Sequence, residues 1–530
     1  MKREEAQMDP SKGRRRSFGS KVGRRPSSLM VYFMVLVVLV ALGFLVDGVT
    51  KVNVTPPGDF SLAGDPLGAA GLSVPVATGP TGSTTAWYCT ISNQGSTATV
   101  PTLDLYNASK VRSHVEIFTS ISSGKAARRV TLLPYGTVTV PMSSFESKKH
   151  FSGVSVVAQG GRPVAAESVS FGSQLVKSPC QSTPGFFWIV TGLYTFARDS
   201  ANVAIYNPFA TPAVVDVSAL TASGEVVPGN FQGIIVGPGQ TTVINLDRVI
   251  PPTSNLAVVV RARSGRIVVG SLQTRSDKYA RGLAVPQATI RPSTLWDYSY
   301  VRTSQSSSSE ITVSNPSSTV AKVRVHLTTS FSNIKSTLPG AHVTSVLETI
   351  PPFSTVSVGL SGELAIPSDG VFSVKVRSLD GVGVGVALSS ALNYFGNSVF
   401  VEPPSTPLYA TRWLVVLSSI SSFVPSNPLA VSLRASTIDP LVISSVSMFD
   451  QTSYLSKLNM LKSVRSSTGT SHRDALAVDV APYTVVSSGI LNVKVNKVHP
   501  LLIVQAESPL VIEPSYSASG SIGFFSLPIN

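Results

Sequence analysis

Two cysteines, Cys89 and Cys180, are the only thiols in this chain of 530 residues. Two thiols cannot build a disulfide-dense scaffold or a four-thiolate zinc site, but they can form one disulfide bond. Because disulfides persist in exported proteins, we expect a Cys89–Cys180 bond if this part of the chain leaves the cytoplasm. A free thiol pair is the alternative. We do not expect a catalytic cysteine, because neither cysteine has a histidine near it in the sequence.

The sequence patterns of the common hydrolases are missing. The six histidines include no pair at metal-ligand spacing, and no Gly-x-Ser-x-Gly elbow occurs. Ser122 and Lys125 have Ser-x-x-Lys spacing, as do Ser332 and Lys335, but the partner motifs Ser-Asp-Asn and Lys-Thr-Gly are absent. We therefore expect no catalytic, metal-binding or cofactor-binding residues. The fold could still bring two carboxylates together, which leaves an exported carbohydrate-active hydrolase as the enzymatic alternative.

The composition favours strands over helices. Charged residues make up only 13% of the chain, whereas glycine and proline occur 40 and 37 times. Glu and Lys are scarce while Val, Ser and Thr are abundant, which is typical of many short strands joined by turns. The length corresponds to three or four domains of ~100–200 residues each.

Four tryptophans divide the chain at similar intervals of 101, 108 and 117 residues. They are Trp87, Trp188, Trp296 and Trp413. Self-similarity near a fixed period is the signature of a repeat protein. We expect each tryptophan to pack in the core of its own repeat, and the alternative is an exposed aromatic platform for a ligand.

A short strand that ends in asparagine follows each tryptophan. The spacing is 19 or 20 residues in the first three copies and 14 residues in a looser fourth copy, where the strand of 429–433 matches equally well. The asparagines are Asn107, Asn207, Asn315 and Asn427. Because asparagine tolerates the left-handed backbone conformation, we interpret these residues as strand-end turn formers and not as ligands.

Two further motifs complete each copy. A proline turn leads into a strand at 133–138, 237–243, 350–356 and 481–485. A closing hairpin follows at 154–167, 257–269, 373–384 and 491–504. Glycine at the hairpin turns supplies the positive φ that tight turns need. Four ordered copies of this set predict an all-β fold with four tandem immunoglobulin-like β-sandwich repeats after a single N-terminal transmembrane helix.

The N-terminal residues predict where the repeats are located. Residues 1–28 carry nine Lys or Arg and three acids, and 29–46 are an uncharged apolar run of 18 residues. A helix of that length spans ~27 Å, close to the ~30 Å hydrocarbon core of a bilayer. Because the positive charges precede the run, we expect the tail to stay in the cytoplasm and the remainder to be exported.

The apolar run has two interpretations. It is longer than the apolar region of a cleaved signal peptide, and no Ala-x-Ala site follows it, so we expect an uncleaved signal anchor that holds the protein in the lipid bilayer. The alternative is a cleaved signal peptide. Arg15-Arg16-Ser17-Phe18 also loosely resembles a twin-arginine export signal, although an ordinary positive tail explains it equally well.

These signals divide the chain into eight parts. The expected division is a basic cytoplasmic tail (1–28), a transmembrane signal anchor (29–46), a stalk that leads into the repeats (48–85), β-sandwiches at 86–180, 184–281, 292–402 and 407–515, and a C-terminal tail (516–530).

The order of the motifs resembles an uncharacterised family of actinobacterial proteins, membrane-anchored or secreted, with tandem β-sandwich repeats classed as a domain of unknown function. The resemblance covers most of residues 86–510 and is closest in the second repeat, where Trp188 and Gly192 precede Ile205-Tyr206-Asn207-Pro208. It implies no known activity.

In that family the closing hairpin ends in a Val-Ala-Glu-like sequence. Glu167 and Glu507 keep the acidic residue, whereas Leu272 or Gln273 and Leu388 stand near its place in the other repeats. The missing acids favour a structural role for this position.

Taken together, the sequence predicts a non-catalytic, single-pass plasma-membrane protein whose extracytoplasmic repeats are a structural or binding component of a bacterial cell envelope. The exported part holds 33 basic and 25 acidic residues, and this excess favours weak attraction to an anionic cell-wall polymer, or ordinary solubility. Basic clusters with interleaved aromatics are missing, so we expect no nucleic-acid partner. An accessory subunit of a cell-wall assembly complex, docked on a membrane protein complex, is a further alternative.

Overall fold

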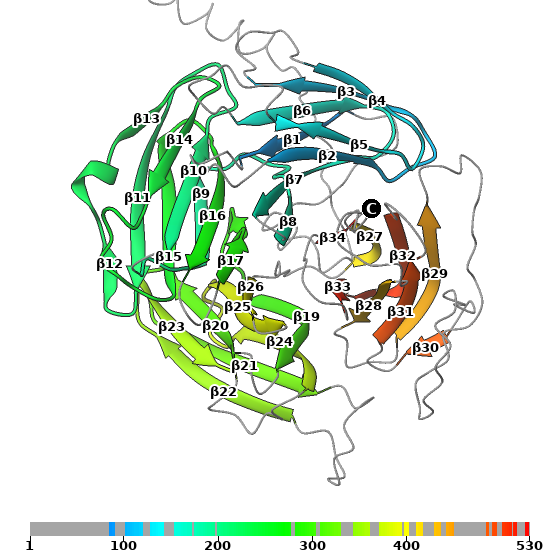
Figure 1. Cartoon of the computed structure of the whole chain (residues 1–530). Coiled ribbons are helices and arrows are strands. Elements are labelled where there is room, and N and C mark those ends of the chain that lie inside the picture. Colours follow the sequence, from blue (N-terminus) through cyan, green and yellow to red (C-terminus); the bar gives the residue numbers. More distant parts are fainter. Residues whose placement is uncertain are drawn as a thin grey trace, which may run out of the picture. The chain divides into compact units, whose positions relative to one another are not determined.

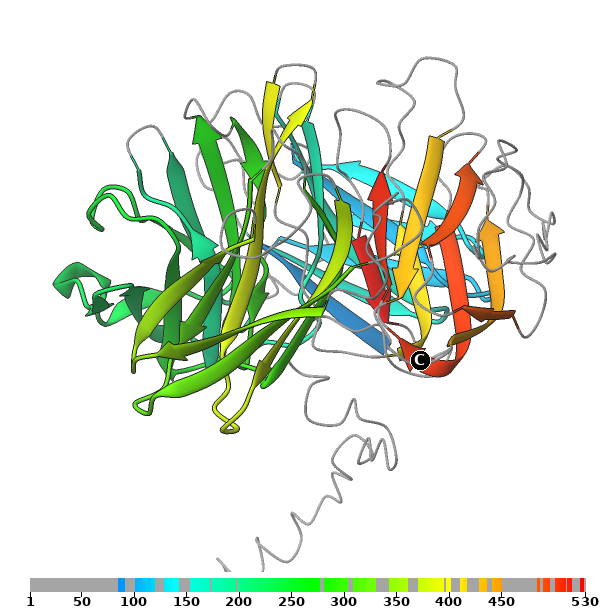
Figure 2. The ribbon, with the colours of Figure 1, turned by 90° about the horizontal axis from the view of Figure 1, so that it is seen from below.

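The described residues of the computed structural model form strands joined by tight turns (Figures 1 and 2). They are residues 84–90, 101–119, 128–142, 153–171, 174–196, 199–276, 281–303, 308–329, 343–360, 370–394 and 397–401, followed by eight strands between 410 and 528. All belong to one compact unit, Gly64–Asn530. One 3₁₀ turn, η3 (Gly229–Phe231), interrupts the strands of the described part. The predicted all-β fold is therefore confirmed for these residues.

The predicted cytoplasmic tail (1–28), the signal anchor (29–46) and the stalk as far as residue 83 lie outside the described residues. Within the described part of the chain, no helix has the length and apolar character needed to cross a membrane.

The first set of strands forms two antiparallel sheets that pack against each other. Its strands are β1 (Thr84–Cys89), β2 (Thr102–Asn107), β3 (Ser113–Phe118), β4 (Arg128–Leu132), β5 (Thr137–Pro141), β6 (Val154–Gln159), β7 (Pro163–Phe171) and β8 (Gln174–Pro179). The sheet orders are β1-β6-β3-β4 and β5-β2-β7-β8. Leu103 and Leu105 of β2 lie in one buried cluster with Val115 and Ile117 of β3, so the core lies between the two sheets. Alternate residues along each strand supply it, as expected for a half-buried strand.

The second and third sets repeat this pairing. The second comprises β9 (Phe187–Leu193), β10 (Ser200–Tyr206), β11 (Ala213–Thr221), β12 (Gly224–Val226), β13 (Ile234–Val236), β14 (Thr241–Asn245), β15 (Leu256–Ser264), β16 (Val268–Ser276) and β17 (Arg281–Ala284), and β18 (Ala288–Thr289) pairs with β9. The third comprises β19 (Leu295–Thr303), β20 (Ser308–Asn315), β21 (Ala321–Thr329), β22 (Val343–Ile350), β23 (Ser354–Gly359), β24 (Gly370–Ser378), β25 (Gly385–Tyr394) and β26 (Asn397–Val401). In the third set the orders are β19-β24-β21-β22 and β23-β20-β25-β26.

The remaining strands form a fourth set, and its first seven strands pair in the same order as those of the first set. They are β27 (Ala410–Val416), β28 (Leu429–Ala435), β29 (Leu441–Phe449), β30 (Thr484–Val486), β31 (Ile490–Val495), β32 (Leu501–Leu510), β33 (Ile512–Tyr516) and β34 (Phe525–Pro528). The sheet orders are β30-β29-β32-β27-β34 and β31-β28-β33. The last strand, β34, adds to the edge strand β27 and not to β33, in contrast to β8 on β7.

The predicted closing hairpins are wrong in the first three sets. β6 pairs with β1 and β3, whereas β7 pairs with β2 and β8, so the turn between β6 and β7 crosses from one sheet to the other. β15 and β16 are separated in the same way, as are β24 and β25. The glycines of the first crossing do adopt positive φ, 71° at Gly160 and 64° at Gly161.

The predicted hairpin of 491–504 is also wrong. β31 pairs with β28, and β32 pairs with β27 and β29 in the other sheet. The sixth-to-seventh crossing of this set lies instead between β32 and β33.

The strand order also differs from the immunoglobulin arrangement that the sequence predicted. In an immunoglobulin sandwich the first, second, fourth and fifth strands share a sheet, and the seventh pairs with the sixth. Here the second pairs with the fifth and the third with the sixth, as expected, but the first, fourth and seventh strands lie in the opposite sheets. The crossing after the sixth strand accounts for the place of the seventh strand, which pairs with the second.

Single residue pairs join the second and third sets into one extended sheet. Thr221 of β11 pairs in parallel with Ser354 of β23, and Arg281 of β17 pairs with Val399 of β26. A buried hydroxyl contact of 2.7 Å between Thr191 and Ser314 adds a side-chain link between the same sets.

The sheet crossing generates a stability prediction. An alanine Cβ at Gly161 would lie 2.9 Å from the Val111 carbonyl oxygen and 3.0 Å from Asn107 Oδ1, at a φ that L-residues rarely adopt. We expect Gly161→Ala to reduce the free energy of unfolding by about 1–3 kcal/mol, which would appear as a lower urea midpoint. Gly359→Ala is the matched control, because nothing lies within 4 Å of its Cβ position. Equal midpoints for the two variants would contradict the requirement for glycine at this crossing.

Candidate functional site: ties between the two sheets

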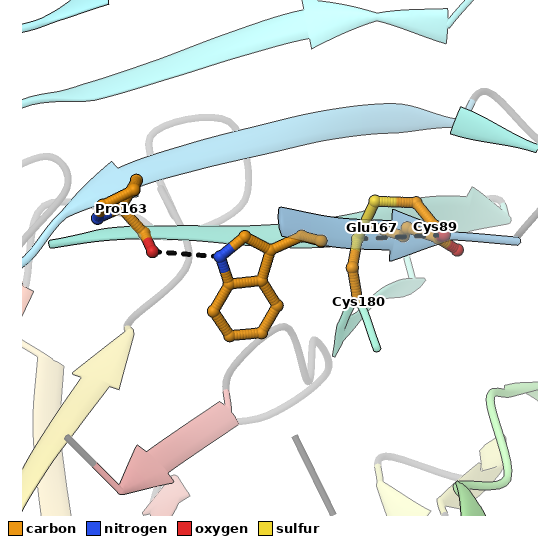
Figure 3. Close-up of a disulfide and its surroundings, with 5 residues drawn as sticks. Cys89, Pro163, Glu167 and Cys180 are labelled. Atoms are coloured by element: carbon orange, nitrogen blue, oxygen red, sulfur yellow. Dashed lines mark hydrogen bonds between the residues drawn. A yellow bond between two sulfur atoms is a disulfide. The ribbon is translucent and has the colours of Figure 1, made fainter. Parts of the chain in front are cut away.

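The buried tryptophans link the two sheets of their sets through the indole N–H. Trp87 donates to the Pro163 carbonyl at 3.0 Å, and Figure 3 shows this bond. Trp188 donates to Ile267 at 2.9 Å and Trp296 donates to Val384 at 2.9 Å. In each case the tryptophan lies in the first strand, and the carbonyl stands where the seventh strand begins, in the opposite sheet.

These bonds explain why the tryptophans recur. A buried indole N–H needs an acceptor, and the sheet crossing delivers a carbonyl at the right place. Trp87, Trp188 and Trp296 are each at most 2% exposed, so none presents its ring to a ligand in solvent. Trp413 stands at the same register, opposite Val504 of the sixth strand β32, and its side chain lies outside the described part.

The asparagines tie the loops at one end of each set. Asn107 donates to the carbonyls of Val111 and Leu133, at 2.7 and 3.0 Å. The second and third sets repeat both bonds. Asn207 donates to Thr211 and Val236, and Asn315 donates to Thr319 and Ile350.

Each asparagine therefore connects its own turn, four residues ahead, with the residue that precedes or begins the proline turn. Asn107, Asn207 and Asn315 are all buried, and none is among the described residues with positive φ. The sequence-based reason for their presence, tolerance of the left-handed conformation, is thus wrong for these three. Their side-chain amides explain the positions instead. Asn427 lies outside the described residues.

The predicted disulfide is confirmed. Cys89 ends β1 and Cys180 follows β8, with their Cα atoms 4.7 Å apart (Figure 3). Next to it, Tyr88 and Gln181 exchange two backbone hydrogen bonds of 2.8 and 2.9 Å. The covalent bond therefore joins the first strand of one sheet to the end of the last strand of the other.

A buried glutamate lies against this disulfide. Cys180 Sγ is 3.9 Å from a carboxylate oxygen of Glu167, and the three side chains offer ligand atoms within 4.8 Å of one another. Both sulfurs are bonded to each other, so neither is a thiolate that could hold a metal ion. The group is a structural cluster in this state, and Figure 3 shows its members converging.

The positions that the sequence analysis named as equivalent to Glu167 are only partly equivalent in the structure. Glu167 faces Leu103 across the ladder, and the corresponding residues are Ser271 opposite Val203 and Leu388 opposite Ile311. Leu272 and Gln273, named from the sequence, are therefore one and two residues too late. Glu507 lies in the sixth strand β32 and not in a seventh strand.

A second polar cluster, unpredicted from the sequence, lies on the sheet β5-β2-β7-β8. Asp104 accepts hydrogen bonds from Lys177 and Thr139 at 2.6 Å each, and from Ser168. The side chains of Asp104 and Lys177 are 3% and 8% exposed, so this is a buried ion pair. Lys177 also donates to the hydroxyl of Tyr106 at 3.1 Å.

Burial and charge act in opposite directions on Asp104. Burial alone raises the pKa of its carboxyl, but the nearby ammonium of Lys177 and three hydrogen bonds lower the pKa below its ordinary value. Burial, with the negative charge of Asp104, raises the pKa of Tyr106 well above its usual range. Asp104, Lys177 and Tyr106 are partners of one another in this cluster, so removal of one of them leaves a buried polar group unpaired.

Polar groups also line the contact between the second and third sets. The guanidinium of Arg275 stacks 4.3 Å from the ring centre of Tyr194, whose hydroxyl is 2.7 Å from Ser389. Asn255 donates to Glu310 at 2.7 Å, and burial raises the pKa of Glu310. These side chains connect strands far apart in the sequence and hold two sets in register.

Residues 172–295 match the model of a family of unknown function (DUF5719). The match begins just before β8 and ends where β19 begins, so it includes the whole second set, where the sequence resemblance is closest. No curated protein matches the chain. No solved structure matches it either.

The Asp104–Lys177 pair generates a prediction with a defined pH dependence. The pKa of Asp104 is lowered in the folded state, so the pair contributes stability above the unfolded pKa of ~3.9 and loses it as pH falls through the folded pKa. We expect Asp104→Asn to destabilise by about 3–5 kcal/mol at pH 7, because it leaves buried Lys177 unpaired. Urea midpoints should converge with wild type as the pH falls through the lowered folded-state pKa of Asp104.

Two further variants complete this test. Combining Asp104→Asn with Lys177→Met should recover much of the loss, since no buried charge remains. Glu116→Gln is the control, because its partner Arg129 is 79% exposed and surface ion pairs contribute little. A pH-independent difference between Asp104→Asn and wild type would contradict the assigned protonation.

The disulfide generates a separate prediction. It spans 91 residues, for which chain entropy gives about 4–5 kcal/mol. We expect the double variant Cys89→Ser, Cys180→Ser to unfold at lower urea concentration than wild type. A dithiol reductant should lower the midpoint of wild type and leave the variant unchanged. A reductant effect on the variant as well would show that the loss does not arise from this bond.

Proposed function

We propose that this protein is a non-catalytic, membrane-anchored repeat protein of a bacterial cell envelope, with its β-sandwiches on the extracytoplasmic side. In this proposal residues 29–46 anchor it in the plasma membrane as a single pass, and residues 1–28 remain in the cytoplasm. The repeats act as a rigid scaffold that presents binding surfaces to an anionic cell-wall polymer or a membrane protein complex.

The observation that carries the proposal is the Cys89–Cys180 disulfide. Its sulfurs are buried, with Cys89 1% and Cys180 2% exposed, and it closes the first set at both ends. A bond of this kind forms and persists in an oxidising compartment. That compartment agrees with the basic tail and the apolar run that precede it.

The recurrent polar residues support a scaffold role. The indoles of the first three sets and the asparagines of the same sets all bind backbone carbonyls. These residues recur where they hold the two sheets together, so their repetition supports a structural role. Within the proposal, the four sandwiches occupy 86–180, 184–281, 292–402 and 407–515, with a C-terminal tail at 516–530.

Membrane topology is the direct test. Ser318 lies in an exposed turn of the third set, and Ser11 lies in the tail. In intact cells we expect a membrane-impermeant maleimide to label Ser318→Cys and to spare Ser11→Cys until the cells are lysed. The native cysteines serve as an internal control, because a bonded pair does not react.

Two outcomes would overturn the proposal. The first is equal labelling of the two variants in intact cells. The second is release of the full chain from membranes by an alkaline wash, which removes peripheral proteins but not a transmembrane helix.

A further inference from the structure

The sheet β19-β24-β21-β22 carries five basic side chains on two neighbouring strands. β21 alternates buried Val323 and Val325 with Lys322, Arg324 and His326 on the opposite side. β24 alternates in the same way and adds Lys375 and Arg377. These five residues are called the basic face below, and Lys322, Arg324 and Arg377 among them are exposed.

Like charges stand directly opposite each other on this face. The register pairs Arg324 with Arg377 and His326 with Lys375. Directly opposed like charges destabilise a pair of strands. At His326, burial together with the charges of Lys375 and Arg324 lowers the pKa of the imidazole and so favours its neutral form, which leaves Arg324 and Arg377 as the opposed pair of charges.

The acids that the structure describes near the basic face are engaged elsewhere. Asp297 is buried and binds Lys375 at 3.5 Å. Asp380 accepts bonds from two backbone N–H groups and from Ser378. Glu348 is opposite Val323 in the register, which places it on the core side of edge strand β22. Among the described residues, no carboxylate forms an ion pair with Arg324 or Arg377.

The corresponding sheets of the first two sets are balanced. On the first, Arg129 binds Glu116 at 2.7 Å. On the second, Arg263 binds Asp216 at 2.5 Å, and Arg261 lies 3.8 Å from Glu225. In both sheets an arginine therefore has an acidic neighbour across the strands. Among the three sets whose side chains are described, the opposed arginines belong to the third set.

We propose that the basic face of the third set is a docking surface for a linear phosphodiester polymer, laid along β21 and β24. Charge complementarity identifies the occupant, because an anion placed between Arg324 and Arg377 replaces their repulsion with two attractions. This inference deepens the proposed function by naming its binding surface, and it rests on that function only for the cellular origin of the polymer.

An extended phosphodiester fits this geometry. Alternate residues of a strand are about 6.6–6.8 Å apart, so the exposed cations Lys322 and Arg324 follow each other along β21. Arg377 on β24 lies about 5 Å away across the strands, whereas Lys375 is paired with Asp297. A phosphodiester has two free oxygens that can accept from two neighbouring guanidinium groups, which matches the opposed pair Arg324 and Arg377.

The test measures binding of a purified poly(glycerol phosphate) to the full chain across a salt series. We expect Arg324→Ser combined with Arg377→Ser to weaken binding about tenfold or more and to reduce the salt slope by about one to two units. The matched control is Arg129→Ser combined with Arg263→Ser, which removes the same charge from exposed residues of the corresponding sheets. The control should change affinity by less than about threefold.

Because the N-terminal tail is unchanged in every variant, any binding that it contributes cancels from the comparison. Equal losses in the two double variants would overturn the proposal, since they would indicate net charge alone. Polygalacturonate binding as tight as poly(glycerol phosphate) binding would overturn the selectivity for phosphodiesters. Stronger binding to anionic lipid vesicles, lost in the same variant, would assign the face to a membrane surface instead.

A stability measurement separates a binding defect from misfolding. Since the opposed arginines repel each other, the Arg324→Ser, Arg377→Ser variant should have a urea midpoint equal to or above that of wild type. A lower midpoint would show that these arginines stabilise the fold, and would overturn their assignment as a binding surface. Neither result depends on membrane topology, so a failure of this inference is distinct from a failure of the proposed function.

Discussion

The crossing from the sixth strand to the seventh is the constraint on which the rest of the structure depends. Because the seventh strand starts in the opposite sheet, the carbonyl at its start can accept a hydrogen bond from a donor that reaches across the core. The buried indole N–H groups of Trp87, Trp188 and Trp296 need an acceptor, and each donates to this carbonyl. In the second and third sets the same carbonyl also accepts a backbone N–H, from Gly185 or Ser293, so both of its lone pairs are used.

The order of motifs along the chain could be predicted from the sequence, but their pairing could not. Tryptophan and asparagine spacings are local signals, and the strands that they predict are present. Alternating apolar residues on both sides of Gly160 and Gly161 predict two strands and a tight turn. This pattern does not indicate whether the second strand joins the same sheet or the facing one. Both choices bury alternate residues, so the immunoglobulin order was an analogy and not a consequence of the pattern.

The candidate site was predictable to a similar degree. Two thiols have one available partner each, so the pairing of the disulfide could be predicted from composition. The place of Glu167 beside the disulfide and the Asp104–Lys177 pair could not be predicted in this way, because both depend on register between strands over 60 residues apart. The usable signal was an acid within an apolar strand, Leu103-Asp104-Leu105, since a buried carboxylate in such a strand requires a cation.

The contacts that hold each copy together are made by residues other than those that distinguish one copy from another. The indole and amide ties are the same in three sets and involve backbone carbonyls, so they are insensitive to the side chains on the outer faces. Those faces are therefore free to differ, and they do: arginine meets glutamate or aspartate in the first two sets, and arginine meets arginine in the third. The opposed arginines of the third set are unfavourable for stability, whereas the first two sets show the favourable arrangement. Because the unfavourable pair lies on an exposed sheet face, the described copies differ at their outer surfaces while they share the ties of the core.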